Sequence, residues 1–221
     1  MTTAGDVLDG GTPAPSTNPV VIFRQGAGHV QPNSAADPGL VFDSGYTDWL
    51  GFLCGTQLPA SFCTDTGITV LDPSDFNVAS IAIGDLAGAQ IVTRRVTSVS
   101  KRRAPYTPTI PGMEGFDVQV SPAAITLRRG ETKSFTVKFT RTSAAVGAYA
   151  GGQLTLTDST DTYKVRVPVV VRPVALAAPV EVAGSYNVTF GYTGAFTATP
   201  RGLVEAAVTS GTVQDDPSNG A

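Results

Sequence analysis

The sequence predicts a mainly β chain with a two-layer β-sandwich at its centre, and three observations support this. Glycine and proline are plentiful, with 24 and 16 residues among 221, while only 15% of the residues are charged. Valine and threonine recur in short runs, which is typical of strands and turns rather than long helices. From about residue 76 onward, apolar and polar side chains alternate with the period of two that a half-buried strand requires.

Seven candidate strands occupy about one hundred residues of this region. They are Val78–Ile83, Gln90–Val99, Tyr106–Ile110, Phe116–Val120, Ser134–Thr140, Leu154–Leu156 and Val165–Val171. Their spacing is that of an immunoglobulin-like or fibronectin-III-like sandwich over residues 76–172. Pro168 cannot donate to a strand ladder, so the last strand is expected to lie at an edge there. Lys101, Arg102 and Arg103 predict a solvated hairpin turn, with a docking patch for another domain or an acidic surface as the alternative.

The flanks of the sandwich have a different character. Residues 1–75 predict an irregular segment, with a short strand at Val20–Phe23 and a short helix over residues 47–55, capped by Thr47 or Asp48. Residues 173–221 begin with an Ala-Pro-rich linker and restart a strand pattern. About forty residues with some three strands are too few to bury a core alone, so we expect an incomplete β module or tail.

The chain holds few groups that could carry out chemistry. His29 is its only histidine, and a serine nucleophile would need a base, an orienting partner and an elbow motif that the sequence lacks. One histidine and two cysteines make a poor zinc set, and no phosphate-binding loop is present. Asp158 and Asp161, like Asp215 and Asp216, are better explained as turn residues than as calcium ligands. We therefore expect no catalytic residue, no cofactor and no metal site.

The charge and the two cysteines bound the choice of compartment and partner. A formal net charge of −3 and a pI near 5.0 give no reason to expect nucleic acid or an anionic membrane. No apolar run is long enough to span a bilayer, and the first residues do not form a signal peptide. Cys54 and Cys63 could form a disulfide in an exported protein, or remain free thiols in a cytoplasmic one.

One long stretch resembles a known family. GAGHVQPNSAADPGLVFDSGYTDWLGFLCG, residues 26–55, resembles the part of subtilisin-like serine proteases (subtilases) that follows the catalytic serine helix. The first four residues, MTTA, are similar to the end of that helical segment. Residues 91–100 and 118–140 resemble the fibronectin-III-like domain of the same proteases. The resemblance covers roughly residues 1–172, and Met1 would then be internal to a longer parent chain.

The resemblance implies a division into three parts: residues 1–75 as the C-terminal tail of an α/β catalytic domain, 76–172 as the fibronectin-III-like sandwich, and 173–221 as linker and incomplete β module. His29 is not the catalytic histidine of the family, and none of the catalytic motifs falls in this chain. Gly26, Gly28, His29, Pro38 and Gly39 are expected to form a backbone framework. The glycines permit a positive φ or a close backbone approach, and Pro38-Gly39 suits a type II turn.

The resemblance also implies a function. The chain would be the non-catalytic C-terminal region of a secreted or cell-surface serine endopeptidase, inactive alone, whose parent hydrolyses peptide bonds with a triad located upstream. Its partners would be the upstream catalytic domain and, through the parent, protein substrates. Secretion would favour the disulfide between Cys54 and Cys63. The alternative is an independent extracellular sandwich that serves as a binding or adhesion module.

Overall fold

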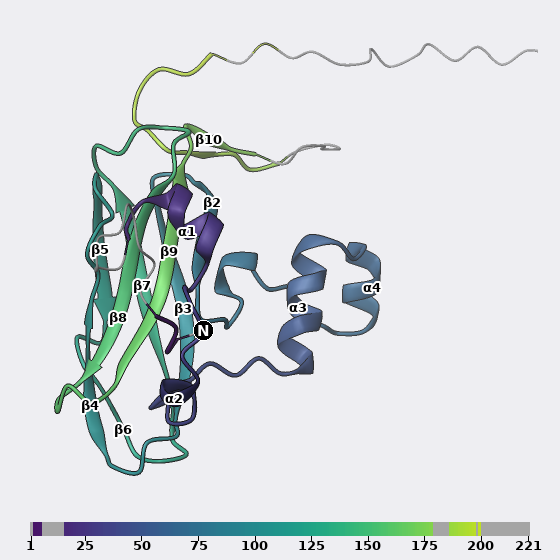
Figure 1. The fold of residues 1–221 in the computed structure, drawn as a ribbon. Coiled ribbons are helices and arrows are strands. Elements are labelled where there is room, and N and C mark those ends of the chain that lie inside the picture. Colours follow the sequence, from purple (N-terminus) through teal and green to yellow (C-terminus); the bar gives the residue numbers. More distant parts are fainter. Residues whose placement is uncertain (1, 6–15, 179–185, 198, 200–221) are drawn as a thin grey trace, which may run out of the picture.

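The computed structural model describes residues 2–5, 16–178, 186–197 and 199. Its centre is a sandwich of two sheets, from which a pair of helices projects to one side (Figure 1). The chain is mainly β, as the composition predicts. Among the described residues, no helix is both long and apolar enough to cross a bilayer.

The first sheet has four strands in the order β1-β3-β7-β5, and all its neighbouring pairs are antiparallel. Their bounds are β1 Leu40–Val41, β3 Ala89–Ser98, β7 Thr132–Arg141 and β5 Phe116–Ser121. The second sheet has the order β2-β9-β8-β4-β6, and only its β2–β9 pair is parallel. Those bounds are β2 Ile81–Leu86, β9 Lys164–Pro173, β8 Ala150–Asp158, β4 Ala104–Thr109 and β6 Ile125–Leu127.

The core lies between the sheets and follows the period-two pattern. Phe135, Val137 and Phe139 of β7 are at most 1% exposed, whereas the residues between them face outward or are half-buried. Leu154 and Leu156 of β8 meet them from the opposite sheet as part of the same buried cluster. Because each such side chain contributes roughly 1.5–3 kcal/mol on burial, this two-sided alternation is the main source of stability.

The strand predicted at Val20–Phe23 is wrong, since this stretch lies in helix α1, Pro19–Gln25. The side chain of Asn18 accepts a hydrogen bond from the backbone N–H of Val20, and Pro19 occupies the first turn, where its missing N–H costs nothing. Capping and docking against the sandwich thus outweigh the strand preference of the β-branched residues. The remaining helices are α2 Pro32–Ala35, α3 Tyr46–Thr56, α4 Ala60–Asp65 and the 3₁₀ turn η1 Pro73–Asp75.

The edge position predicted for the last strand is correct at Pro168 but not beyond it, since β9 pairs with β8 alone at Pro168 and with both neighbours from Val169 onward. β9 lies inside its sheet, between β2 and β8. Pro168 is tolerated because pairing with β2 begins only at Val169, so no ladder hydrogen bond is missing at the proline. Two strands escaped the sequence pattern, β1 and β6, because runs of two and three residues are too short to show a period.

The division into three parts remains a prediction, although the packing crosses its first boundary. Leu40, in the segment before residue 76, is fully buried in the sandwich core and pairs with Ser98 of β3. Of the predicted third part, the structure describes a short hairpin of β10, Leu176–Ala177, and β11, Thr189–Phe190. The rest of that part lies outside the described residues, apart from the few beside the hairpin.

Candidate functional site

The N-terminal segment is fastened to the sandwich by the guanidinium group of Arg166. This residue lies on β9 and is only 6% exposed. Its Nη2 donates to the carbonyl oxygens of Ala4, Gly5 and Ala27 at 3.0, 2.6 and 2.7 Å. The backbone N–H of Arg166 donates to the carbonyl of Thr2. One buried side chain therefore joins two stretches of the N-terminal segment that are more than twenty residues apart.

Gly28 makes this close approach possible. Its φ is +104°, and a Cβ placed on it would lie 2.0 Å from the carbonyl oxygen of Gly5 and 3.2 Å from Nη2 of Arg166. Gly5 in turn donates its N–H to the carbonyl of His29 at 2.6 Å. Gly26, at φ +56°, ends helix α1 and has nothing near its missing Cβ. Gly26 thus serves a backbone turn, whereas Gly28 serves a backbone contact.

Pro38 and Gly39 form a second contact between this segment and the sandwich. Gly39 has φ +74°, and a Cβ on it would lie 2.6 Å from the ring of Tyr163. Its carbonyl accepts hydrogen bonds from the N–H groups of Val99 and Ser100 at the end of β3. The hydroxyl of Tyr163 donates to the carboxylate of Asp37 at 2.9 Å. We call the Arg166 and Gly39 contacts together the seam.

A second buried arginine holds the stretch that leads into the sandwich. Arg94 of β3 is 2% exposed and donates to the carbonyls of Ser74, Val78 and Ser80, as well as to that of Thr93. Burial lowers the pKa of Arg94 to about 10, against the opposing effect of the Asp75 carboxylate. The guanidinium is therefore still charged at neutral pH, and carbonyl dipoles rather than a carboxylate bond to it.

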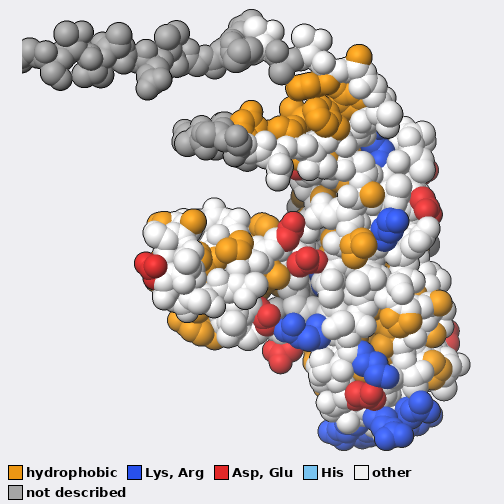
Figure 2. Space-filling model, turned by 180° about the vertical axis from the view of Figure 1, so that it is seen from behind, with side chains coloured by type: hydrophobic (Ala, Val, Ile, Leu, Met, Phe, Trp, Pro, Cys, Tyr) orange, Lys and Arg blue, Asp and Glu red, His pale blue; other side chains and the backbone are white. Residues whose placement is uncertain are grey.

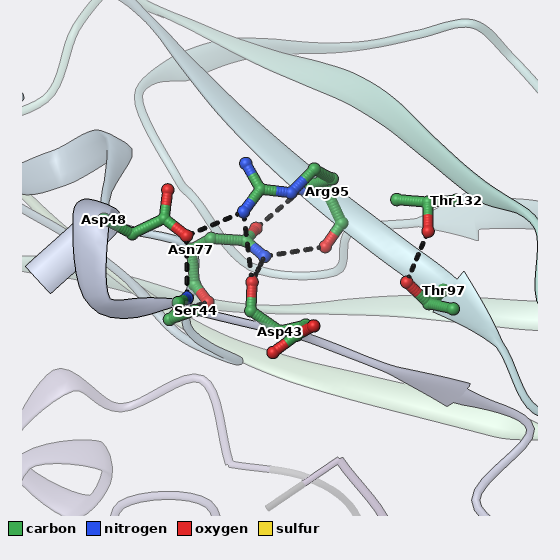
Figure 3. Close-up of polar contacts among 8 residues, drawn as sticks. Asp43, Ser44, Asp48, Asn77, Arg95, Thr97 and Thr132 are labelled. Carbon is green, nitrogen blue, oxygen red and sulfur yellow. Dashed lines mark hydrogen bonds and ion pairs between the residues drawn. The ribbon is translucent and has the colours of Figure 1, made fainter.

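The pair of helices α3 and α4, residues 46–65, is attached to β3 through a polar network (Figure 3). Buried Asn77 donates to the carbonyls of Asp43 and Arg95, and its side-chain oxygen accepts from the N–H of Arg95 at 2.7 Å. Arg95 also binds the Asp48 carboxylate at 2.9 Å and the carbonyl of Asp43. Ser44 donates to the carbonyl of Asn77. This network fixes the start of α3 against the first sheet.

The helices themselves are joined by a disulfide between Cys54 and Cys63, with a Cα–Cα distance of 5.9 Å. Trp49 and Phe52 of α3 pack on Phe76 with ring centroids 4.5 and 4.9 Å apart. Other large apolar surface of this helical lobe is exposed, since Tyr46, Trp49 and Phe62 are 79%, 49% and 42% exposed. A lobe with several exposed large apolar side chains is typical of a surface with a partner.

The chain can now be compared with known proteins. Residues 75–171 match the family model described as a fibronectin type-III domain. Two Arabidopsis thaliana proteins, subtilisin-like proteases SBT2.6 and SBT2.5, are 43% and 42% identical to the chain over 154 residues, which is 67% of this chain and 19% of each relative. This chain is a homologue of subtilisin-like proteases. A third relative from the same plant, subtilisin-like protease SBT5.4, is 36% identical over 158 residues, 68% of this chain and 20% of that protein. The chain thus spans about a fifth of the length of the curated relatives it matches.

The subtilase homologue brings the sequence-predicted framework residues to one place. Gly28, Pro38 and Gly39 lie in the seam, and His29 contributes its backbone carbonyl to it. The residue His29 is exposed. Within the described part of the chain, no three His, Cys, Asp or Glu side chains gather in a way that could hold a metal ion. The arrangement supports structural docking, since Arg166 donates to backbone carbonyls and Tyr163 to the carboxylate of Asp37.

Sequence reasoning missed both buried arginines of this homologue. A signal for Arg94 existed, because it stands at the inward position between Val92 and Val96, and all three are buried. A charged residue at an inward position of a period-two strand predicts a group with built-in partners. Arg166 had no comparable signal, since it shares its face of β9 with Lys164 and Pro168, which is typical of an outward face, and its partners lie some 140 residues or more away.

Proposed function

We propose that this chain is the non-catalytic C-terminal region of a secreted subtilisin-like serine endopeptidase and that it supports the catalytic domain of the parent. The observation that carries the proposal is the seam, in which Arg166, Gly28 and Gly39 join the residues of the subtilase-like motif to the sandwich. The homology to subtilisin-like proteases gives the seam its context.

In this proposal each of the three parts has its own role. The segment up to residue 75 continues the catalytic domain, the sandwich of residues 76–172 anchors that segment, and residues from 173 lead away. Peptide-bond hydrolysis belongs to a triad upstream, so protein substrates are met by the parent. The exposed apolar side chains of the helical lobe, such as Tyr46 and Phe62, are where the upstream catalytic domain would pack. The disulfide is in keeping with an oxidising, extracellular compartment.

The test compares a parent protease with a variant that lacks the sandwich. We expect the intact parent to hydrolyse a peptide substrate, and this chain alone to show no turnover, with or without His29→Gln. Deletion of the region corresponding to residues 76–172 should lower the melting temperature and the soluble yield of the parent. A deletion variant with unchanged activity and unchanged melting temperature would contradict the supporting role.

A second candidate, an independent extracellular binding module, has one observation in its favour. Phe190, Tyr192 and Phe196 beside the terminal hairpin form a cluster with Phe190 at its centre, 4.7 Å from the ring of Phe196, and all three are 38–55% exposed. By contrast, Tyr106 is buried and Tyr163 packs on Gly39. A glycan array and a pull-down should compare the intact chain with a double variant, Phe190→Ala with Phe196→Ala. A ligand that binds the intact chain and is lost in the double variant would support the binding module.

A further inference from the structure

Six cationic side chains gather at one end of the sandwich, opposite the terminal hairpin. Figure 2 shows Lys and Arg side chains over this end of the molecule, beyond the helical lobe. We call this the basic tip and define it as Lys101, Arg102, Arg103, Arg128, Arg129 and Lys133. All six residues are exposed. Three come from the loop between β3 and β4, and three from the turn between β6 and β7 and the start of β7.

The backbone holds the two loops side by side. Ser98 donates its N–H to the carbonyl of Glu131 at 3.0 Å, and Gly130 donates back to the carbonyl of Ser98 at 2.7 Å. On the other side, Ala104 of β4 pairs with Leu127 of β6. Side chains of Arg103, Arg128, Arg129 and Lys133 line one shallow hollow between the loops. The cations therefore form one surface rather than two separate turns.

The fold does not neutralise this surface. Glu131 is the only acidic residue in either loop, and it lies 3.2 Å from Lys133 while accepting a hydrogen bond from the backbone N–H of Arg128. Six cations and one carboxylate give the tip a formal charge of +5, so the rest of a chain with a net charge of −3 carries −8. Arg95 and Arg172, by contrast, are each paired with a carboxylate, that of Asp48 and that of Asp85.

The chemistry of the tip indicates a partner that is held by charge alone. Between residues 92 and 145, no large hydrophobic side chain is exposed. A stable protein–protein interface has an apolar, often aromatic, centre, and insertion into a membrane needs apolar side chains, so neither partner fits a surface of this composition. Guanidinium groups form bidentate hydrogen bonds with carboxylates. The arginines of the tip are spread along two loops and do not converge on one point.

We propose that the basic tip binds a linear acidic polysaccharide, one whose sugars carry carboxylates at regular intervals. Successive carboxylates would pair with arginines of the two adjacent loops, and release of counterions would contribute to the affinity. The tip shares no residue with the seam, so this proposal goes beyond the supporting role and does not depend on it. A polymer of this kind would hold the protein in an anionic matrix while leaving the helical lobe and the seam uncovered.

The test measures binding of a fluorescently labelled polygalacturonate oligomer of about ten sugars to the whole chain, with neutral dextran as the blank. We expect binding at about 50 mM salt that weakens severalfold by about 200 mM, because exposed charges are screened. The variant Arg128→Glu with Arg129→Glu should lose at least about tenfold in affinity, because two cations become two anions. Both side chains are exposed, so an unchanged melting temperature shows that the fold persists.

The matched control is Arg24→Glu with Lys138→Glu, two exposed positions outside the tip that change the net charge by the same amount. We expect this control to lose less than about threefold in affinity, because its charges lie away from the tip. Equal losses in both double variants would show an effect of net charge alone and overturn the proposal. Absence of binding to the intact chain would do the same, as would equal affinity for phosphatidylserine vesicles or duplex DNA.

Discussion

Replacing Arg166 with methionine is the most direct perturbation of the seam. Methionine keeps the apolar stem but removes the guanidinium that serves the carbonyls of Ala4, Gly5 and Ala27. The β-sandwich core does not depend on this group, because the buried cluster between the sheets contains neither Arg166 nor residues 2–5. We therefore expect the variant to release the N-terminal segment locally while the sandwich stays folded.

The magnitude follows from the hydrogen bonds of Nη2, whose two hydrogens are shared among three carbonyl oxygens. A hydrogen bond from a charged donor is worth about 1.5–3 kcal/mol, and the desolvation of a buried guanidinium offsets part of the sum. A net loss of about 3 kcal/mol in the free energy of local opening is a consistent figure. Since about 1.4 kcal/mol corresponds to a factor of ten, amide exchange in the released segment should accelerate on the order of 100-fold.

The assay is native-state hydrogen exchange, with the amide of Gly5 as the reporter because it donates to His29 at 2.6 Å. Arg172→Met on the same strand is the matched control. Its side chain bridges Asp85 at a partly exposed site, where an ion pair is worth at most about 1 kcal/mol. Two outcomes would show that the guanidinium of Arg166 does not hold the segment. In one, Arg166→Met accelerates amide exchange in β7 as strongly as at Gly5. In the other, Gly5 stays as protected in Arg166→Met as in Arg172→Met.

Three further predictions concern the framework, acid stability and the disulfide. Gly28→Ala should destabilise the seam by about 2 kcal/mol or more, because φ +104° is strained for alanine and its Cβ would meet the carbonyl of Gly5; exchange at Gly5 reports it. Burial opposes ionisation of Asp158, but hydrogen bonds from Thr160 and Tyr163 lower its pKa below the ordinary value. That stability is present above about pH 4 and is lost as the pH falls through the folded pKa, so Asp158→Asn should flatten the acid limb of a melting-temperature profile. Reduction of the Cys54–Cys63 disulfide should lower the stability of the helical lobe by roughly 2–3 kcal/mol, which faster limited proteolysis of the lobe would report. The melting temperature of the sandwich should stay unchanged.

The strands of the sandwich were largely predictable from sequence, because each buries one face and shows the period of two. Phe135, Val137 and Phe139 are the clearest case, and all three lie in the core. The exceptions have physical causes. Helix α1 carries β-branched residues, which in the sequence predict a strand. The only local signal for a helix is the cap at Asn18 followed by Pro19, and it is weaker than the strand pattern. β1 gains its place from pairing with β3, which no local pattern encodes.

The site was predictable in part. The glycines before His29 and the Pro38-Gly39 pair are visible in the sequence, so Gly28 and Gly39 could be selected as framework residues before their contacts were known. The group that they approach could not be identified. Arg166 lies about 140 residues from Ala27, and only the fold brings its guanidinium to that carbonyl. A contact between a charged side chain and backbone carbonyls far away in the sequence leaves no periodic pattern from which it could be predicted.

Both buried arginines solve the same problem with the same chemistry. Irregular backbone that lies against a sheet leaves carbonyl groups away from water, and each of these needs a donor. Arg94 supplies donors for residues 74–80 and Arg166 for residues 4–5 and 27, so one side chain satisfies several carbonyls at once. Together with Leu40 in the core, these clamps make the segment before residue 76 part of the sandwich's own packing. The segment before residue 76 therefore resists separation from the sandwich, because pulling it away would expose the carbonyls, leave two guanidinium groups without these acceptors and open the core at Leu40.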